Sequence, residues 1–120
     1  FSDRYLDILR VNSQLAYDQV QKLNIAVKQQ TGANQDILTI SKSTGAMYTM
    51  IGLNIEMFDD SVNDDADFAR RILIEENLSL LPGQAFTMKD YVRLVISCPP
   101  NVVEEVFNRI QSFCLAHIKK

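Results

Sequence analysis

Arg93 is the residue of this sequence whose chemistry is most informative. It lies in the run Tyr-Val-Arg-Leu-Val-Ile of residues 91–96. This run predicts a strand with at least one buried face, and a guanidinium placed there needs an anion because desolvating an unpaired charge is costly. The anion is either an internal Asp or Glu side chain, or the carboxylate or phosphate of a ligand. Both ligand groups fit the guanidinium fork in bidentate geometry.

The loop before this strand contains two further candidate binding residues, Gly83 and Phe86. Pro82 and Gly83 are expected to end the preceding strand, because proline lacks an amide donor and glycine permits unusual backbone angles. A flexible turn and an aromatic ring would then border Arg93. Residues 84–90 follow no loop pattern that assigns them a role.

The sequence contains no self-contained catalytic motif and no metal-ligand pattern. A glycine-rich phosphate loop, a nucleophile elbow and an HExxH helix are all absent from it. The single histidine, His117, and the two cysteines, Cys98 and Cys114, have neither disulfide-scaffold nor zinc-site spacing. We therefore expect no catalytic residue and no bound metal in this chain, and we expect both thiols to be buried.

An acidic stretch, residues 59–67, resembles a calcium loop only superficially. In the EF-hand register Asp64 stands where glycine is required, and Arg70 stands where the bidentate Glu is required. We expect these acids instead to cap the beginning of a helix and to complement its positive end.

Length and composition predict one globular domain over residues 1–120. The chain is 47% hydrophobic, which is enough for one core, and its net charge of -3 provides no basic stripe for nucleic acid. No apolar run approaches the roughly 20 residues of a membrane span, and no signal peptide opens the sequence. A soluble, cytoplasmic protein is expected.

Hydrophobic periodicity predicts an α+β fold, with a small, mostly antiparallel sheet covered by helices. A long amphipathic helix over residues 2–30 ends at Gly32 and is longer than such a core requires. The predicted order is helix-strand-strand-helix-strand-strand-helix. After the first helix come strands at 37–41 and 46–55 with a turn at 43–45, a helix at 64–77, strands at 78–81 and 91–96, and a last helix with an Asn101 cap.

Four segments, taken in order, resemble the C-terminal small domain of fold-type-I pyridoxal-phosphate aminotransferases. The resemblance is closest to the tyrosine aminotransferases and covers the whole chain, with the first helix, about residues 1–31, resembling the helix that connects to the small domain. The segments are Ser-Thr-Gly-Ala-Met-Tyr at 43–48, Leu-Pro-Gly at 81–83 followed by Phe86, Tyr-Val-Arg-Leu at 91–94, and Arg-Ile-Gln-Ser-Phe-Cys at 109–114.

The resemblance implies that Arg93 binds the α-carboxylate of the substrate, with Gly83 and Phe86 beside it. It implies transfer of an amino group from tyrosine or another aromatic amino acid to a 2-oxo acid such as 2-oxoglutarate, by a homodimeric enzyme that uses pyridoxal phosphate. No lysine of this sequence stands in the context of the Schiff-base lysine, so this lysine and the cofactor-binding residues are expected upstream. The fragment alone is expected to be inactive and to bind no cofactor.

Two other functions stay open at this point. One is a free-standing amino-acid-binding or interaction module without catalysis. The other keeps the aminotransferase fold but uses alanine or another amino acid as substrate, because the Gly-Ala-Met-Tyr and Leu-Pro-Gly motifs also occur in alanine aminotransferases. The sequence does not decide side-chain specificity.

Overall fold

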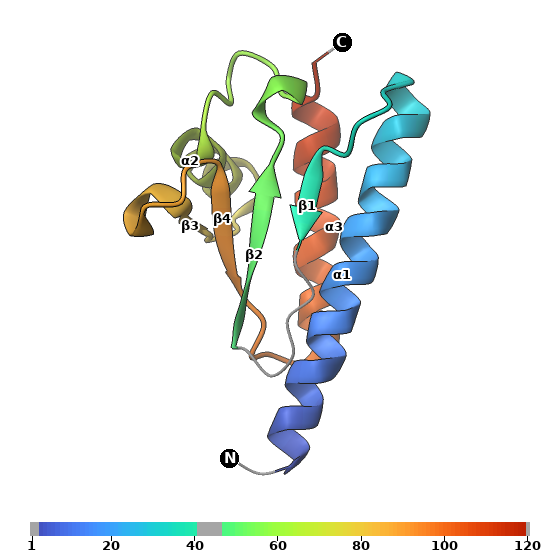
Figure 1. The fold of residues 1–120 in the computed structure, drawn as a ribbon, viewed down its shortest axis with the longest axis vertical. Coiled ribbons are helices and arrows are strands. Elements are labelled where there is room, and N and C mark those ends of the chain that lie inside the picture. The colour runs from blue at the N-terminus through green and yellow to red at the C-terminus, as the bar shows by residue number, and fades with distance from the viewer. Residues whose placement is uncertain (1–2, 41–46, 120) are drawn as a thin grey trace.

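A computed structural model of the chain describes residues 3–40 and 47–119. In these residues a four-stranded antiparallel sheet packs with three α-helices, which confirms the predicted α+β class and element order (Figure 1). The elements are α1 (Asp3–Thr31), β1 (Leu38–Ile40), β2 (Tyr48–Leu53), η1 (Ile55–Met57), α2 (Asp65–Glu76), β3 (Leu81–Pro82), η2 (Gly83–Phe86), β4 (Tyr91–Val95) and α3 (Pro100–His117), where η denotes a short 3-10 helix.

The sheet has the strand order β1-β2-β4-β3, which places β4 between two neighbours. Arg93 of β4 is paired with Met50 of β2 on one side and with Leu81 of β3 on the other. Side chains alternate between the two faces of a strand, so Val92 and Leu94 enter the core while Arg93 points to the opposite face. The sheet therefore fixes the position of the Arg93 backbone from both sides.

The core lies between one face of the sheet and the helices, and α1 and α3 lie side by side (Figure 1). Phe68 of α2 is its aromatic centre, because its ring packs edge-to-face against Phe58 at 5.7 Å and against Phe113 of α3 at 5.0 Å. The first turns of α1 extend past the end of the sheet (Figure 1). No helix in the described ranges has both the length and the apolar character needed to cross a membrane.

Two buried asparagines hold α1 to the rest of the fold. Asn24 is 2% exposed, and its amide both donates to the Leu38 carbonyl at 2.9 Å and accepts from the Leu38 amide at 3.0 Å. Asn12, which the periodicity places on the apolar stripe of the helix, donates to the carbonyls of Ile96 and Cys98. These side chains satisfy backbone groups that the short sheet leaves unpaired.

Replacing Asn24 by leucine should lower the free energy of unfolding by about 3 kcal/mol, because the buried amide and carbonyl of Leu38 then lose their partner. Urea unfolding of the chain measures this loss. Asn108→Leu is the matched control, since Asn108 is exposed on α3. Equal stability of the two variants would contradict the proposed anchoring of α1.

The predicted boundaries of the second and third strands are wrong, while the first strand begins and the last strand ends one residue from the prediction. The third strand begins at Leu81 and includes Pro82, whereas residues 78–80 lie outside any strand. Proline fits there because β3 is at the edge of the sheet, where no ladder donor is required. The second strand ends at Leu53 instead of residue 55, because the chain turns into η1. The predicted turn at 43–45 lies outside the described residues.

The helix boundaries are closer to expectation. The acidic cap of α2 is confirmed, because the Asp64 side chain accepts a hydrogen bond from the Asp67 amide at 2.8 Å. The predicted Asn101 cap of α3 is wrong, since the helix already begins at Pro100. Proline is favoured at the first position of a helix because its backbone angle is already helical and it has no amide hydrogen to leave unpaired.

Candidate functional site

Arg93 lies half-buried on the face of the sheet that points away from α1 and α3. Its Cζ is 4.8 Å from the centre of the Tyr48 ring and 5.6 Å from the centre of the Phe86 ring. The ion pairs of residues 3–40 and 47–119 all involve other cations, so no described carboxylate neutralises Arg93. Of the two anions that the sequence allows, the internal Asp or Glu is therefore not observed in the described part of the chain.

The two aromatic rings partly compensate the charge of Arg93 without cancelling it. A guanidinium within about 6 Å of a ring centre gains about 0.5–2 kcal/mol from the ring quadrupole. Aromatic rings accept no hydrogen bonds in the plane of the guanidinium, so its N–H groups stay available for a carboxylate. Tyr48 was not among the candidates from sequence, because only the pairing of β2 with β4 brings it to Arg93.

Gly83 and Phe86 both belong to η2, but they have different roles in its geometry. Phe86 contributes its ring to Arg93. Gly83 is buried, its carbonyl accepts a hydrogen bond from the Met88 amide at 2.7 Å, and a Cβ atom at Gly83 would lie 1.7 Å from the Met88 carbonyl oxygen. The absence of a side chain at Gly83 thus permits the turn that brings Phe86 over β4.

A shallow, mostly apolar pocket of about 390 Å³ borders Arg93. An apolar wall next to an unpaired cation suits a molecule that joins a carboxylate to a hydrophobic group. The described residues that line the pocket include no histidine, aspartate or glutamate. The apolar lining includes Leu78, Leu81, Val95, Cys98, Val102 and Val106.

The chain matches parts of aminotransferases along its whole length. It is 28% identical to nicotianamine aminotransferase A of Hordeum vulgare over 120 residues, which is 100% of this chain and 23% of that protein. It is 36% identical to tyrosine aminotransferase of Homo sapiens over 76 residues, which is 63% of this chain and 16% of that protein. The resemblance to aminotransferases is confirmed. No protein-family model matches the chain.

Solved aminotransferase structures contain the same fold. Tyrosine aminotransferase from Leishmania infantum superposes with a TM-score of 0.80 at 27% identity, covering 98% of this chain and 26% of that one. Aspartate aminotransferase from Thermotoga maritima, at 20% identity and a TM-score of 0.72 over 96% of this chain and 25% of that one, shares the fold. The chain therefore spans about a quarter or less of the length of these aminotransferases.

The lysines of the present chain that the structure describes do not fit a Schiff-base site. Such a site needs an amine shielded from water and free of a permanent counter-ion. Lys22, Lys89 and Lys119 are exposed, and Lys28 forms an ion pair with Asp36 at 2.6 Å. None of these four lysines therefore meets the requirements of a Schiff-base site.

His117 takes part in a structural cluster at the end of α3. Its Nε2 lies 2.6 Å from Glu75 of α2, and its Nδ1 lies 3.0 Å from the Ser61 hydroxyl and 3.3 Å from Asp59. Partial burial raises the pKa of Asp59, but hydrogen bonds from Ser61 and His117 outweigh it and lower the pKa below its ordinary value. No group of three potential metal ligands occurs among the described residues. The hydrogen bonds of His117 join α3 to α2 and to the segment before it.

The two cysteines are not activated nucleophiles. Cys114 is fully buried in the core, and Cys98 is partly buried at the edge of the apolar pocket. Burial raises the pKa of both thiols, which favours the unreactive protonated form. The expected burial is thus confirmed for Cys114, whereas Cys98 is only half-buried.

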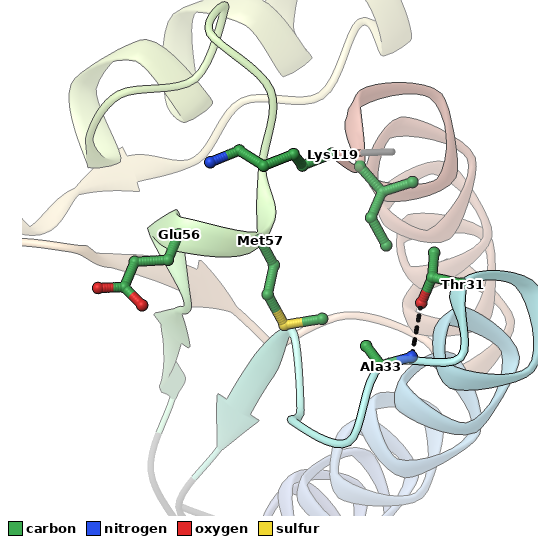
Figure 2. A pocket seen from close by; sticks show the side chains of 6 residues that line it. Thr31, Ala33, Glu56, Met57 and Lys119 are labelled. Atoms are coloured by element: carbon green, nitrogen blue, oxygen red, sulfur yellow. Dashed lines mark hydrogen bonds between the residues drawn. The ribbon is translucent and has the colours of Figure 1, made fainter.

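A second pocket, of about 280 Å³, lies at the end of α1 and near η1 (Figure 2). Thr31 lines it, but its hydroxyl already donates to the Val27 carbonyl at 2.8 Å and accepts from the Ala33 amide at 3.2 Å. Figure 2 shows the charged ends of Glu56 and Lys119 directed away from Thr31. Because no polar groups converge on this pocket, we do not assign it a ligand.

Asp65 is a buried acid whose contacts were not predicted from sequence, because it lies within an acidic stretch expected to cap the beginning of a helix. Its side chain is fully buried. Burial raises its pKa, but hydrogen bonds from the Asp90 amide and from Gln84 outweigh burial and lower the pKa below 3.8. As the pH falls, Asp65 therefore binds a proton at a higher pH in the unfolded chain than in the folded chain.

Acid should therefore destabilise the fold through Asp65. Because the folded pKa is depressed, the stabilisation is fully present above the unfolded value of about 4 and is lost as the pH falls below it. We expect the free energy of unfolding to fall between about pH 5 and pH 2, and the Asp65→Asn variant to show a shallower fall. Urea unfolding at a series of pH values tests this, and parallel curves for the two proteins would contradict it.

Proposed function

We propose that this chain is the C-terminal small domain of a pyridoxal-phosphate-dependent aminotransferase, in which Arg93 binds the α-carboxylate of the substrate. The observation that carries the proposal is a guanidinium held between two aromatic rings, without an ion-pair partner in the described residues, at the border of an apolar pocket. The homology to aminotransferases supports the reaction class.

In this proposal residues 1–120 are one domain, and α1 connects it to the rest of the enzyme. The first turns of α1 extend beyond the sheet, where the remainder of the enzyme would cover them (Figure 1). These relatives are about four times as long as the chain, which leaves room for a larger domain. That domain would supply the Schiff-base lysine and the residues that hold the cofactor.

The contribution of this chain is to bind and orient the substrate. The two strands beside β4 fix the backbone of Arg93, and the rings of Tyr48 and Phe86 restrict its guanidinium. A bidentate contact with the carboxylate then fixes the orientation of the amino acid. A fixed orientation raises the rate of the reaction more than tight binding in a random orientation would. Closure of the domain over the substrate would exclude water. The cofactor, when bound, supplies the electron sink for transfer of the amino group.

Tyrosine or another aromatic amino acid is the proposed donor, with a 2-oxo acid such as 2-oxoglutarate as acceptor. The relatives named tyrosine aminotransferase and the apolar pocket beside Arg93 support this choice. Steady-state assays of the full-length protein with tyrosine, phenylalanine, alanine and nicotianamine test it. We expect the highest kcat/KM for an aromatic amino acid, and a preference for alanine or nicotianamine would change the substrate assignment.

A free-standing amino-acid-binding module is the alternative function. Calorimetric titration of the 120-residue chain with L-tyrosine separates the two, because in the proposed enzyme the rest of the pocket lies outside this chain. We expect no measurable heat of binding, and micromolar binding would favour the module.

The proposed enzyme is also a cytoplasmic homodimer. Analytical ultracentrifugation of the full-length protein tests the dimer, and cell fractionation tests the location.

A further inference from the structure

Asp65 connects α2 to both ends of the loop formed by residues 84–90. It lies at the first residue of α2, and no described basic residue forms an ion pair with it. Its Oδ2 accepts a hydrogen bond from the Gln84 amide at 2.8 Å, while its Oδ1 accepts from the Gln84 side-chain Nε2 at 2.7 Å and from the Asp90 amide at 3.0 Å. One buried carboxylate thus accepts three hydrogen bonds from a single loop.

The 84–90 loop needs such an anchor because its backbone is strained. Thr87 and Asp90 have φ angles of 66° and 64°, in the left-handed region that residues with a Cβ rarely adopt. The loop also makes few contacts of its own, since its residues other than Phe86 and Asp90 are exposed. Outside the turn closed by Gly83, the hydrogen bonds that hold it run to Asp65 and from the Leu53 amide to the Asp90 carbonyl at 2.9 Å.

Phe86 lies between the two anchored ends of this loop, and its ring is one of the two that flank Arg93. A loop released from Asp65 would let this ring leave the guanidinium. The guanidinium would then sample more rotamers, and a carboxylate ligand would have to restrict them on binding. A weaker affinity for carboxylates follows, although Asp65 itself touches neither the ligand nor Arg93.

We propose that Asp65 is a positioning residue for carboxylate binding, which acts by fixing the 84–90 loop so that Phe86 stays against Arg93. The inference rests on the proposed function of Arg93. It assigns a role to the 84–90 loop, which follows no recognised sequence pattern. Neutralising Asp65 should weaken the binding of every ligand that presents a carboxylate to Arg93, whether an amino acid or a 2-oxo acid.

Asp65→Asn in the full-length enzyme tests this proposal. Asparagine keeps the shape but turns one acceptor into an amide donor that faces the donors of Gln84 and Asp90. We expect the KM for L-tyrosine and the inhibition constant of 3-phenylpropionate, a carboxylate without an amino group, both to rise about 5- to 20-fold, with kcat at saturating tyrosine within twofold of the parent. Asp67→Asn is the matched control, because Asp67 lies in the same helical turn but contacts Asn63 and Arg70 instead of the loop.

Hydrogen exchange provides a readout that a general loss of stability would not reproduce. In the Asp65→Asn enzyme the amides of Gln84 and Asp90 should exchange faster, while the amides of β4 keep their parental protection. If Asp65→Asn fails to fold, Gln84→Ala takes its place, because it removes one of the three hydrogen bonds from an exposed position. Gln84→Ala should also raise the inhibition constant of 3-phenylpropionate, but by a smaller factor than Asp65→Asn.

A double variant separates the two proposals. If Asp65 acts through Phe86, then Asp65→Asn should weaken 3-phenylpropionate binding far less in a Phe86→Ala background than in the parent. An Arg93→Ala enzyme that binds 3-phenylpropionate as the parent does would overturn the proposed function. An enzyme that depends on Arg93 but binds equally well with Asp65→Asn and Asp67→Asn would overturn only the positioning role.

Discussion

Replacing Arg93 by alanine in the full-length enzyme should lower kcat/KM for tyrosine about 100- to 1,000-fold, which corresponds to about 3–4 kcal/mol. The change removes both N–H groups of the bidentate contact and leaves the substrate carboxylate without a partner. The effect should extend to 2-oxoglutarate, because the same guanidinium would bind both substrates. Steady-state kinetics of each half of the reaction measures it.

Two further variants at arginine positions sharpen this test. Arg93→Lys keeps the charge but not the planar fork, so we expect it to recover only part of the lost activity. Arg70→Ala removes an equal charge from α2, where Arg70 is exposed and pairs with Asp67. Arg70→Ala should retain parental kinetics, and Arg93→Ala kinetics that match those of Arg70→Ala would exclude Arg93 from the site.

Gly83→Ala should lower the free energy of unfolding by about 3 kcal/mol and also weaken substrate binding. The added Cβ would lie 1.7 Å from the Met88 carbonyl oxygen and 2.9 Å from the Tyr91 carbonyl oxygen, and backbone atoms cannot rotate away. The turn after β3 must therefore open, which also displaces Phe86 from Arg93. Urea unfolding measures the first consequence, and the KM for tyrosine in the full-length enzyme measures the second.

Gly52→Ala is the comparison that isolates the effect of a rigid neighbour. A Cβ at Gly52 would also collide, at 2.2 Å, but with the side-chain hydroxyl of Thr39, which can rotate. We expect Gly52→Ala to cost less than Gly83→Ala and to leave tyrosine binding unchanged. Equal losses of stability would show that the 83–88 turn is more adaptable than its hydrogen bonds indicate.

The elements around the candidate site could be predicted from sequence to different degrees. Helices α1, α2 and α3 were found within a few residues, because apolar residues at three- and four-residue steps report the buried stripe of each helix. The strand of Arg93 was predicted because residues 91–96 are apolar except for that one charge. Strand β3 was misplaced, since two paired residues at a sheet edge leave almost no periodic signal.

The contacts of the site were less predictable than its elements. Phe86 was expected near Arg93 because a loop and the strand after it are neighbours in sequence, and the structure brings the two side chains together. Tyr48 was not, because it is 45 positions before Arg93 and reaches it only through the register of β2 and β4. Asp65 was expected only to cap a helix, because its contacts with the 84–90 loop depend on where that loop returns in the fold.

The sequence by itself determined the fold class, the order of the elements and the presence of a charge within a buried strand. These follow from local rules, in which each residue is compared with neighbours up to four positions away. Only the tertiary structure decided which rings flank Arg93, which carboxylate holds the loop and which asparagines anchor α1. These contacts join residues distant in sequence, and their free energy depends on packing and desolvation that form only when the sheet and helices meet.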